Sequence, residues 1–171
     1  FENEIFDFIL CNGVLHHTEN PSKAFSNIVG HLKKNGYILV GLYNKIGRIR
    51  TKVRKYIYKI LGKKIVMILD PVLRKTDKKS HDKINAWIKD QYQHPVESTH
   101  TFDEILKWFD SNNVEFINSI PHCSIFETES ENFFQKKSKA TFVVRIFKQI
   151  FMIFSRFGSE GGVFILIGKK K

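Results

Sequence analysis

The first 44 residues alternate between continuous apolar runs and helical spacing, and this pattern predicts three elements. An almost unbroken apolar run over residues 5–10 is typical of a buried strand in a parallel sheet. Asn20-Pro21 suits the start of a helix, and residues 33–36, which end in a glycine, are expected to close it. A second apolar run over residues 37–44 predicts the next strand. Strand, helix and strand in this order form a βαβ unit.

Residues 45–95 break this alternation and predict a helical insertion. Between positions 45 and 64 the chain has nine Lys and Arg residues and no acidic residue, while isoleucine or valine recurs every three or four positions. That combination is typical of a basic amphipathic helix. A break at Asp70-Pro71, a charged link over residues 74–83 and a short helical pattern around Trp87 follow. We therefore expect a helical cap inserted after the second strand.

The last third of the chain returns to helices and strands. Thr101 and Glu104 form a capping-box pattern ahead of a helix, and residues 114–120 alternate like a strand. Residues 140–157 predict a helix with an aromatic stripe, and a glycine-rich turn leads into a closing apolar strand over residues 163–168. The predicted fold class is α/β.

The distribution of charge adds a question about partners. The formal net charge is +11 and the sequence pI is about 9.7, which permits attraction to nucleic acid or to anionic lipid. The basic helix over residues 45–64 could contact RNA phosphates, or it could lie on an anionic membrane surface with its isoleucines buried. Packed against the domain with its cations in solvent, it would do neither. The sequence leaves these three interpretations open.

Cysteine content and hydropathy indicate which cellular compartment to expect and whether the chain crosses a membrane. Cys11 and Cys123 are the only cysteines, so the chain has neither a zinc pattern nor a disulfide framework. Reduced thiols in a cytoplasmic protein are the expected state. The longest apolar run, residues 142–154, is shorter than a membrane span and carries Arg145 and Lys148. We expect no transmembrane segment.

Candidate chemistry follows the first predicted strand. Ligands of open α/β sheets bind beyond the carboxyl ends of the strands, where the corner of residues 11–13 and the pair His16-His17 lie. Adjacent histidines point in different directions and lack the spacing of a helical zinc motif, so we expect no metal site. His17 is a candidate general base because histidine titrates near neutral pH. An ordinary tight turn is the alternative interpretation of the corner.

Polar residues after the second strand are candidates for binding a substrate. Tyr43 and Asn44 end that strand at the same carboxyl edge and could line an acceptor pocket or simply form a turn. Tyr92, His94 and His100 lie in a polar loop before a helix, where they could contact a substrate or stay in solvent.

Two stretches of the sequence resemble a known family. FDFILCNGVLHHT over residues 6–18, and LKKNGYILV over residues 32–40, resemble the second half of a class I S-adenosylmethionine-dependent methyltransferase. In that family the fourth strand typically ends in a V-L-H-H corner, and the next helix ends in L-K-P-G-G before the fifth strand. Asn35 stands where the family usually has proline or glycine. Residues 41–48 and 91–104 resemble a subgroup of these enzymes.

The resemblance implies a fold, a cofactor and a set of residues. It implies a Rossmann-like methyltransferase sheet of parallel strands with an antiparallel closing strand, and methyl transfer from S-adenosylmethionine to an unidentified small-molecule or macromolecular acceptor. By the same resemblance, Cys11, Asn12 and Gly13 flank the methionine part of the cofactor, and Leu15 and His16 continue that wall.

The family's cofactor site has parts without a counterpart in this sequence. The glycine-rich loop after the first strand is missing, and so is the acidic residue that binds the ribose hydroxyls. The resemblance therefore implies that residues 1–171 are the C-terminal portion of one methyltransferase domain, inactive alone, with 45–95 as a basic insertion. In such a fragment we expect the first strand to expose an edge. The alternative is a basic α/β module that binds RNA or an anionic surface without a cofactor.

Overall fold

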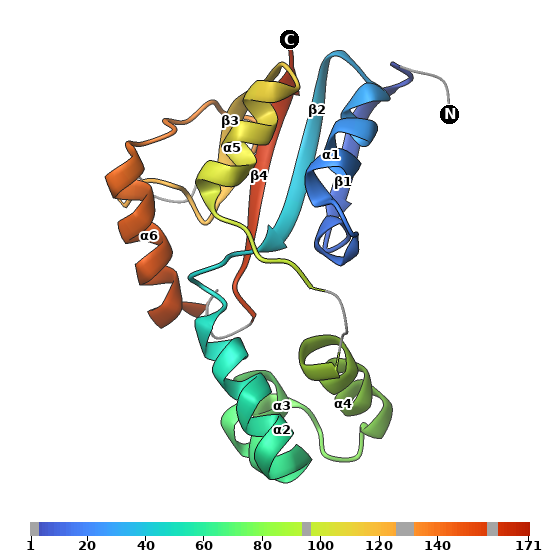
Figure 1. The fold of residues 1–171 in the computed structure, drawn as a ribbon, viewed down its shortest axis with the longest axis vertical. Helices are drawn as coiled ribbons and strands as arrows, with labels where there is room; N and C mark the ends of the chain where they lie inside the picture. The colour runs from blue at the N-terminus through green and yellow to red at the C-terminus, as the bar shows by residue number, and fades with distance from the viewer. Residues whose placement is uncertain (1–3, 94–96, 126–131, 157–160) are drawn as a thin grey trace.

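The fold is built on one sheet of four strands. The computed structural model describes residues 4–93, 97–125, 132–156 and 161–171. Its strands are β1 (Phe6–Asn12), β2 (Leu32–Tyr43), β3 (Val114–Ile120) and β4 (Val163–Lys170), in the spatial order β1-β2-β4-β3 (Figure 1). β1 and β2 are parallel, whereas β4 runs antiparallel to both β2 and β3. The predicted α/β class and the antiparallel closing strand are confirmed.

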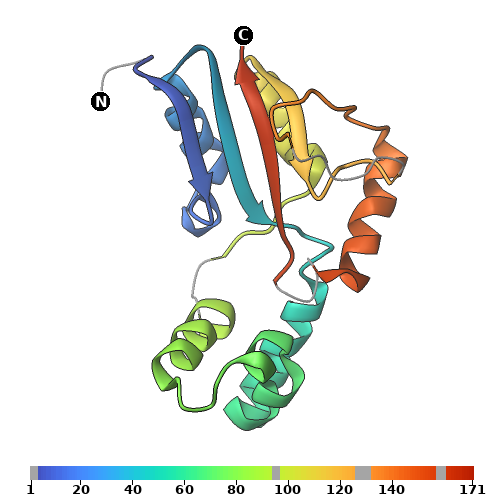
Figure 2. The same cartoon turned by 180° about the vertical axis from the view of Figure 1, so that it is seen from behind.

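Two helices cover one face of this sheet and form the main core with it. They are α1 (Pro21–Gly30) and α5 (Phe102–Ser111), which lie side by side in front of the strands in Figure 1. The rings of Phe25 and Phe109 stack between the two helices at 5.6 Å, and Phe102 meets Phe164 of β4 edge to face at 5.0 Å. Seen from behind in Figure 2, β1 and β2 have no helix of the described chain over them.

The predicted helix starts are confirmed, but one predicted helix end is wrong. The Asn20 side chain accepts the Lys23 backbone N–H at 3.0 Å, and the capping box of Thr101 and Glu104 is present. α1 ends at Gly30, however, so residues 33–36 do not close it. They form an irregularity early in β2, where the Lys33 ammonium pairs with the Asp7 carboxylate of β1 at 3.0 Å.

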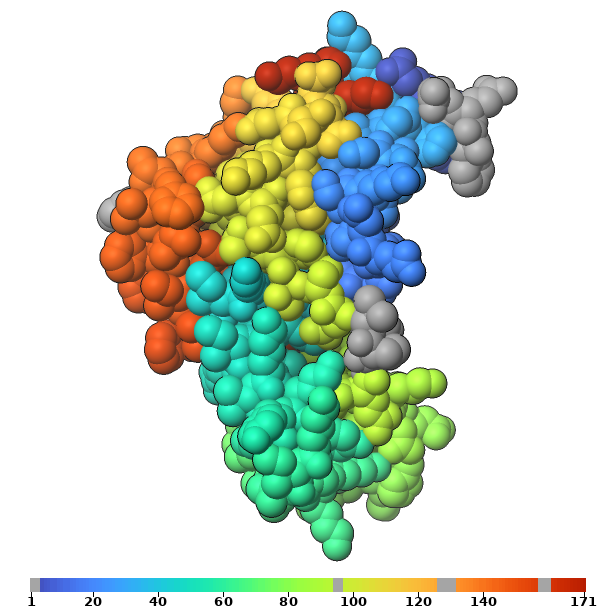
Figure 3. All heavy atoms as spheres, viewed as in Figure 1, coloured from blue at the N-terminus to red at the C-terminus, as the bar shows by residue number. Residues whose placement is uncertain are grey.

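Four helical segments between β2 and α5 build a second core. They are α2 (Ile49–Leu69), α3 (Pro71–Lys75), α4 (His81–Ile88) and the π-helical turn η2 (Lys89–Gln93), which together we call the helical module. Its core includes Val66, Ile84 and Tyr92, separate from the core under the sheet. The module forms a lobe beyond the lower end of the strands in the space-filling view (Figure 3).

Single residues explain the breaks within the helical module. α2 is kinked at Gly62, whose φ of 75° and ψ of −171° are accessible to glycine. Asp70 ends α2 and caps α3, and its carboxylate also accepts hydrogen bonds from Trp87 Nε1 at 3.0 Å and from the Tyr92 hydroxyl. A basic helix is thus present, but it spans Ile49–Leu69 rather than residues 45–64.

The last helix, α6 (Phe142–Phe154), lies at the side of the sheet away from β1 (Figure 1). Gln149 Oε1 accepts a hydrogen bond from Asn44 Nδ2 at 2.9 Å, and the Arg145 guanidinium pairs with the Asp103 carboxylate of α5. These contacts fasten one side of α6 and leave its opposite side outward. Within the described residues, no helix is both long and apolar enough to cross a bilayer.

Candidate functional site

The carboxyl end of β1 forms an open corner. Gly13 has a φ of 75°, and its backbone N–H donates to the Gly41 carbonyl of β2 at 3.0 Å. A methyl group built on Gly13 would meet no heavy atom within 4 Å, so a ligand could approach this backbone closely. Cys11 is buried beside it, and burial raises the pKa of its thiol. Asn12 is exposed and turns its carboxamide oxygen toward Gly41.

His16 is the most unusual polar residue near this corner. It lies in the 3-10 turn η1 (Leu15–His17), where Leu15 packs into the main core and the His16 side chain is 1% exposed. Its ring lies 4.1 Å from that of His17 and 4.3 Å from that of Tyr43. Among the residues that the structure describes, neither of its ring nitrogens has a hydrogen-bond partner. Burial, reinforced by the neighbouring His17, lowers the pKa of His16 to about 4, so its ring is neutral at pH 7.

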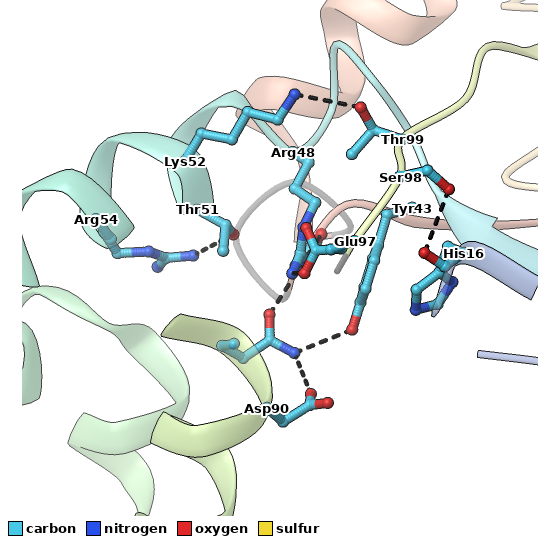
Figure 4. Close-up of polar contacts among 12 residues, drawn as sticks. His16, Tyr43, Arg48, Thr51, Lys52, Arg54, Asp90, Glu97, Ser98 and Thr99 are labelled. Atoms are coloured by element: carbon cyan, nitrogen blue, oxygen red, sulfur yellow. Dashed lines mark hydrogen bonds and ion pairs between the residues drawn. The ribbon is translucent and has the colours of Figure 1, made fainter. Parts of the chain in front are cut away.

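A buried arginine joins the segments that surround Tyr43. The guanidinium of Arg48, 1% exposed, lies 3.4 Å from the centre of the Tyr43 ring (Figure 4). Its Nε and Nη2 donate to the two carboxylate oxygens of Glu97 at 2.7 and 2.6 Å. Its Nη1 donates to Gln91 Oε1 at 3.1 Å and to the Gly161 carbonyl. One side chain thus holds together the end of β2, the turn η2 and the segments before α5 and β4.

The charges within this network are balanced. Burial opposes ionisation of Glu97, but the two hydrogen bonds and the positive charge of Arg48 outweigh it, and the pKa of Glu97 lies below its usual value. Burial raises the pKa of Tyr43, whose hydroxyl accepts a hydrogen bond from Gln91 Nε2 at 3.1 Å. The result is an ion pair beside a neutral phenol and a neutral imidazole, at the carboxyl edge of β1 and β2.

Two of the predicted substrate residues have structural partners instead. Asn44 is fully buried, and its side chain accepts the backbone N–H groups of Ile46 and Gly47 and donates to Gln149. His100 pairs with β2 through an isolated bridge to Asn44, and its ring contacts Ser98 Oγ at 2.8 Å and Glu104 Oε2 at 3.1 Å. Burial lowers the pKa of His100 although Glu104 opposes this effect. These two residues fix the backbone around Tyr43.

The remaining predicted loop residues do not join the corner. Tyr92 points into the core of the helical module, where its ring stacks on Tyr58 at 5.7 Å. His94 lies outside the described residues. His17, the predicted general base, contacts His16 and is partly exposed. The structure therefore brings together Cys11, Asn12, Gly13, His16 and Tyr43 around the ends of β1 and β2.

Arg48, Gln91 and Glu97 belong to this arrangement, and sequence reasoning missed all three as site residues. Arg48 was counted among the cations of the basic helix, which are normally exposed. A usable signal was present, because Gly47-Arg48 follows the carboxyl end of a strand and Gln91 lies in a stretch with family resemblance.

Comparisons with known proteins relate the first part of the chain to a known family. Residues 1–40, which include β1, η1 and α1, match the methyltransferase domain family. A ubiquinone biosynthesis O-methyltransferase of Rickettsia felis is 31% identical over 80 residues, or 47% of this chain. The chain spans 28% of the length of that relative.

Solved structures share the fold at low sequence identity. The structure of PKMT2 from Rickettsia typhi has a TM-score of 0.63 at 13% identity, covering 98% of this chain and 36% of that one. The same protein in complex with AdoHcy has a TM-score of 0.58 at 11% identity, with the same coverage. Family match, curated relative and fold together support a likeness to the class I methyltransferases, the class that uses S-adenosylmethionine.

Proposed function

We propose that this chain forms the acceptor-facing part of a site for methyl transfer from S-adenosylmethionine. The observation that carries the proposal is the neutral, buried His16 ring beside the open corner at Gly13, with two nitrogens that have no partner within the described ranges. Unpaired polar atoms in a buried position are costly, and they are tolerated where a ligand or water completes their hydrogen bonds. The family match over the same residues supplies the chemistry.

The residues of the corner fit part of the cofactor. In the proposal, the exposed Asn12 and the uncovered backbone of Gly13 lie against its amino acid portion, and Cys11 closes the inner wall. S-adenosylmethionine, when bound, supplies a methyl group that is already activated by the positive sulfonium. The sequence has no Gly-x-Gly pattern, and we propose that residues 1–171 alone do not complete the cofactor site.

His16 and Tyr43 are the proposed wall on the acceptor side. A neutral imidazole can donate one hydrogen bond and accept another, so His16 can orient an acceptor that carries a hydroxyl or amine. A pKa of about 4 makes His16 a weak base at neutral pH. Its proposed role is therefore to orient the acceptor rather than to take a proton from it. Arg48 is proposed as a positioning residue, because its guanidinium lies against the ring of Tyr43 and its N–H groups contact Gln91, Glu97 and Gly161.

This reaction needs placement more than acid–base chemistry. Holding a nucleophile in line with an activated methyl group supplies most of the acceleration available to such a site. The acceptor remains unidentified in this proposal, and His17 stays a candidate base for an acceptor that must lose a proton. A basic module that binds RNA without a cofactor gains no support from the comparisons.

The test is binding of S-adenosylhomocysteine by isothermal titration calorimetry to two samples. One sample is the 171-residue chain, and the other is the chain extended by any coding sequence that lies upstream of Phe1. We expect binding to the extended protein only. Replacing Gly13 by Val in that protein should weaken binding at least about tenfold, because the new side chain occupies the open corner.

A matched pair of variants tests the acceptor wall. His16→Gln keeps hydrogen-bonding groups, whereas His16→Phe keeps the ring that packs on Tyr43. If His16 orients the acceptor, the Phe variant loses turnover while cofactor affinity stays within a few-fold, and the Gln variant retains part of the rate. An extended protein that carries a glycine-rich turn and still fails to bind S-adenosylhomocysteine would overturn the proposal. Binding by the 171 residues alone would overturn only the claim that these residues do not complete the cofactor site.

A further inference from the structure

The positive charge of this chain comes from two segments. Residues 45–69 and 132–156 contain 15 of the 28 Lys and Arg residues and none of the 17 Asp and Glu residues. The other residues carry 13 cations against 17 acids and are therefore net negative. The first segment includes α2 and the second includes α6. Seven of these cations lie in α2 and two in α6, and the rest lie in the chain beside the two helices. A local excess of this kind points to a function of the two segments rather than to general solubility.

α6 exposes an apolar stripe along its length. Its sequence FVVRIFKQIFMIF has six large apolar side chains that are 39–78% exposed, with Phe154 the most exposed. They are Phe142, Val143, Phe147, Ile150, Phe151 and Phe154. Their spacing places them on one side of the helix, opposite Gln149 and Met152, which are buried against the rest of the chain. A continuous apolar surface of this kind on a helix indicates an interaction site.

The first half of α2 repeats this arrangement next to α6. Ile49, Val53, Tyr56 and Ile60 are all exposed at steps of four, three and four residues, which is one helical face. The Arg50 guanidinium donates to the Ile153 carbonyl at 3.3 Å, so the start of α2 contacts the end of α6. The apolar residues predicted to form one face of this helix therefore lie on two faces. Ile57 packs toward the core of the helical module, whereas Ile49, Val53 and Ile60 face outward.

The far end of α2 has the same combination of apolar floor and cationic rim. A hollow of about 530 Å³ lies among Met67, Ile68 and Leu73, and Lys64, Arg74 and Lys78 complete its lining. Such a hollow suits an apolar chain that ends in a negative group. α2 and the hollow at its far end thus offer apolar contact and positive charge together, and α6 extends the apolar surface beside α2.

We propose that α6 and α2 bind the surface of an anionic phospholipid bilayer. Interfacial helices combine an apolar face, which enters the headgroup boundary, with Lys and Arg residues that contact anionic lipid. A second copy of this chain is a poor occupant, because it would bring the same acid-free segments together. RNA would use the cations but would leave aliphatic side chains such as Val143, Ile150 and Val53 without a partner.

The test is co-sedimentation of the full chain with vesicles. Vesicles of phosphatidylcholine with about a third phosphatidylglycerol are compared with vesicles of phosphatidylcholine alone, at low and at high salt. We expect binding to the anionic vesicles only, at least about tenfold weaker after the salt is raised, because surface charges are screened. Equal binding to both kinds of vesicle, or to neither, would overturn the proposal.

Two matched sets of variants separate apolar from electrostatic contributions. The pair F147S with F151S removes rings from the α6 stripe and should reduce binding at least about tenfold, whereas F147L with F151L should retain most of it. The pair K59E with K64E on α2 should abolish binding. The same change of charge at two other exposed lysines, K23E on α1 with K107E on α5, should have little effect.

Three results would contradict the bilayer as the occupant. They are unchanged binding by the serine pair, an equal loss in both glutamate pairs, and a dimer whose formation competes with vesicles. Preferential, salt-sensitive capture of single-stranded RNA that is lost in the serine pair would assign the surface to RNA instead. Melting curves of all variants establish that they fold. The experiment contains no cofactor or acceptor, so its outcome is independent of the methyl-transfer proposal.

Discussion

A single residue, Arg48, determines much of the geometry around the site. Its guanidinium is fully desolvated and makes four hydrogen bonds, two of them to Glu97, while its flat face lies on Tyr43. A buried ion pair of this kind is weak evidence of stability, because desolvation offsets much of the attraction. Removing one partner, however, leaves a charge without compensation in the interior.

Glu97→Gln should therefore destabilise the fold strongly. We expect a loss of about 3 kcal/mol in the free energy of unfolding, measured by urea denaturation at pH 7, because Arg48 stays buried without its counter-ion. Asp110→Asn is the control, since Asp110 pairs with Lys139 at an exposed position and should cost less than about 1 kcal/mol. Similar losses in the two variants would mean that the buried pair contributes no more than a surface pair.

The depressed pKa of His16 makes stability depend on pH. In the unfolded chain His16 binds a proton near its ordinary pKa of 6.5, whereas in the fold it does so only near pH 4. The contribution of His16 to the free energy of unfolding is present above pH 6.5 and is lost as the pH falls toward 4. The reason is that the unfolded state then binds more protons than the folded state. From about pH 7 to about pH 5 this loss amounts to about 2 kcal/mol.

The variant His16→Gln isolates this contribution. His100 and Glu97 also have lowered pKa values and act in the same direction, Glu97 at lower pH. The difference between pH 7 and pH 5 in the free energy of unfolding should therefore shrink in the variant without disappearing. An unchanged difference would show that His16 is protonated in the folded chain at pH 5.

At the scale of elements, glycines with the same backbone angle have different surroundings. Gly13 and Gly162 both have a φ of 75°. A side chain added to Gly13 meets open space, whereas one added to Gly162 would lie 2.7 Å from the backbone nitrogen of Arg48. The turn into β4 thus requires glycine for space as well as for conformation, and it carries the carbonyl of Gly161 to Arg48.

The substitutions Gly162→Ala and Gly13→Ala measure this difference. Both pay for a left-handed backbone, about 1 kcal/mol, but only Gly162→Ala adds a clash with the backbone. We expect Gly162→Ala to lower the free energy of unfolding by about 3 kcal/mol and Gly13→Ala by about 1 kcal/mol, in urea titrations followed by circular dichroism. Equal losses would mean that the turn can move away from Arg48.

Local signals in the sequence predicted most elements correctly. Asn20-Pro21, Thr101 with Glu104, and the alternation over residues 114–120 each act within a few positions, so they could be recognised without the fold. The predicted end of α1 was wrong because the chain from Leu32 onward pairs with β1, and that pairing joins residues 26 or more positions apart. Arg48 was missed for the same reason, since its partners Gln91, Glu97 and Gly161 are distant in the chain.

At the scale of the whole molecule, the sheet has a covered and an uncovered face. Phe6, Phe8 and Leu10 alternate along β1 and are all exposed, whereas Ile9 between them packs against the main core. In the described chain β1 is an edge strand that pairs only with β2. The apolar run of β1 predicted a strand covered on both faces, but an apolar run cannot reveal which residues of a protein provide the cover.

The exposed side of β1 should make the isolated chain self-associate. Leu10→Lys places a charge on this strand and should lower light scattering at high protein concentration severalfold. Leu61→Lys on α2 is the control, because Leu61 is 58% exposed and Leu10 is 64% exposed, but a helix offers no strand edge. A monodisperse sample of the unmodified chain, or an equal effect of the two variants, would contradict this prediction.

The separation of the two hydrophobic cores has a consequence for how the chain opens. The two cores share no residue, so we expect two cooperative units with different opening free energies. Gln91 belongs to one unit and Tyr43 to the other, and Arg48 bonds or contacts both. Opening of the helical module would strip Tyr43 of a hydrogen bond while the sheet stayed intact. Access to the acceptor wall would then follow a partial unfolding equilibrium, and any ligand that bridges both units would slow hydrogen exchange in helices that it never touches.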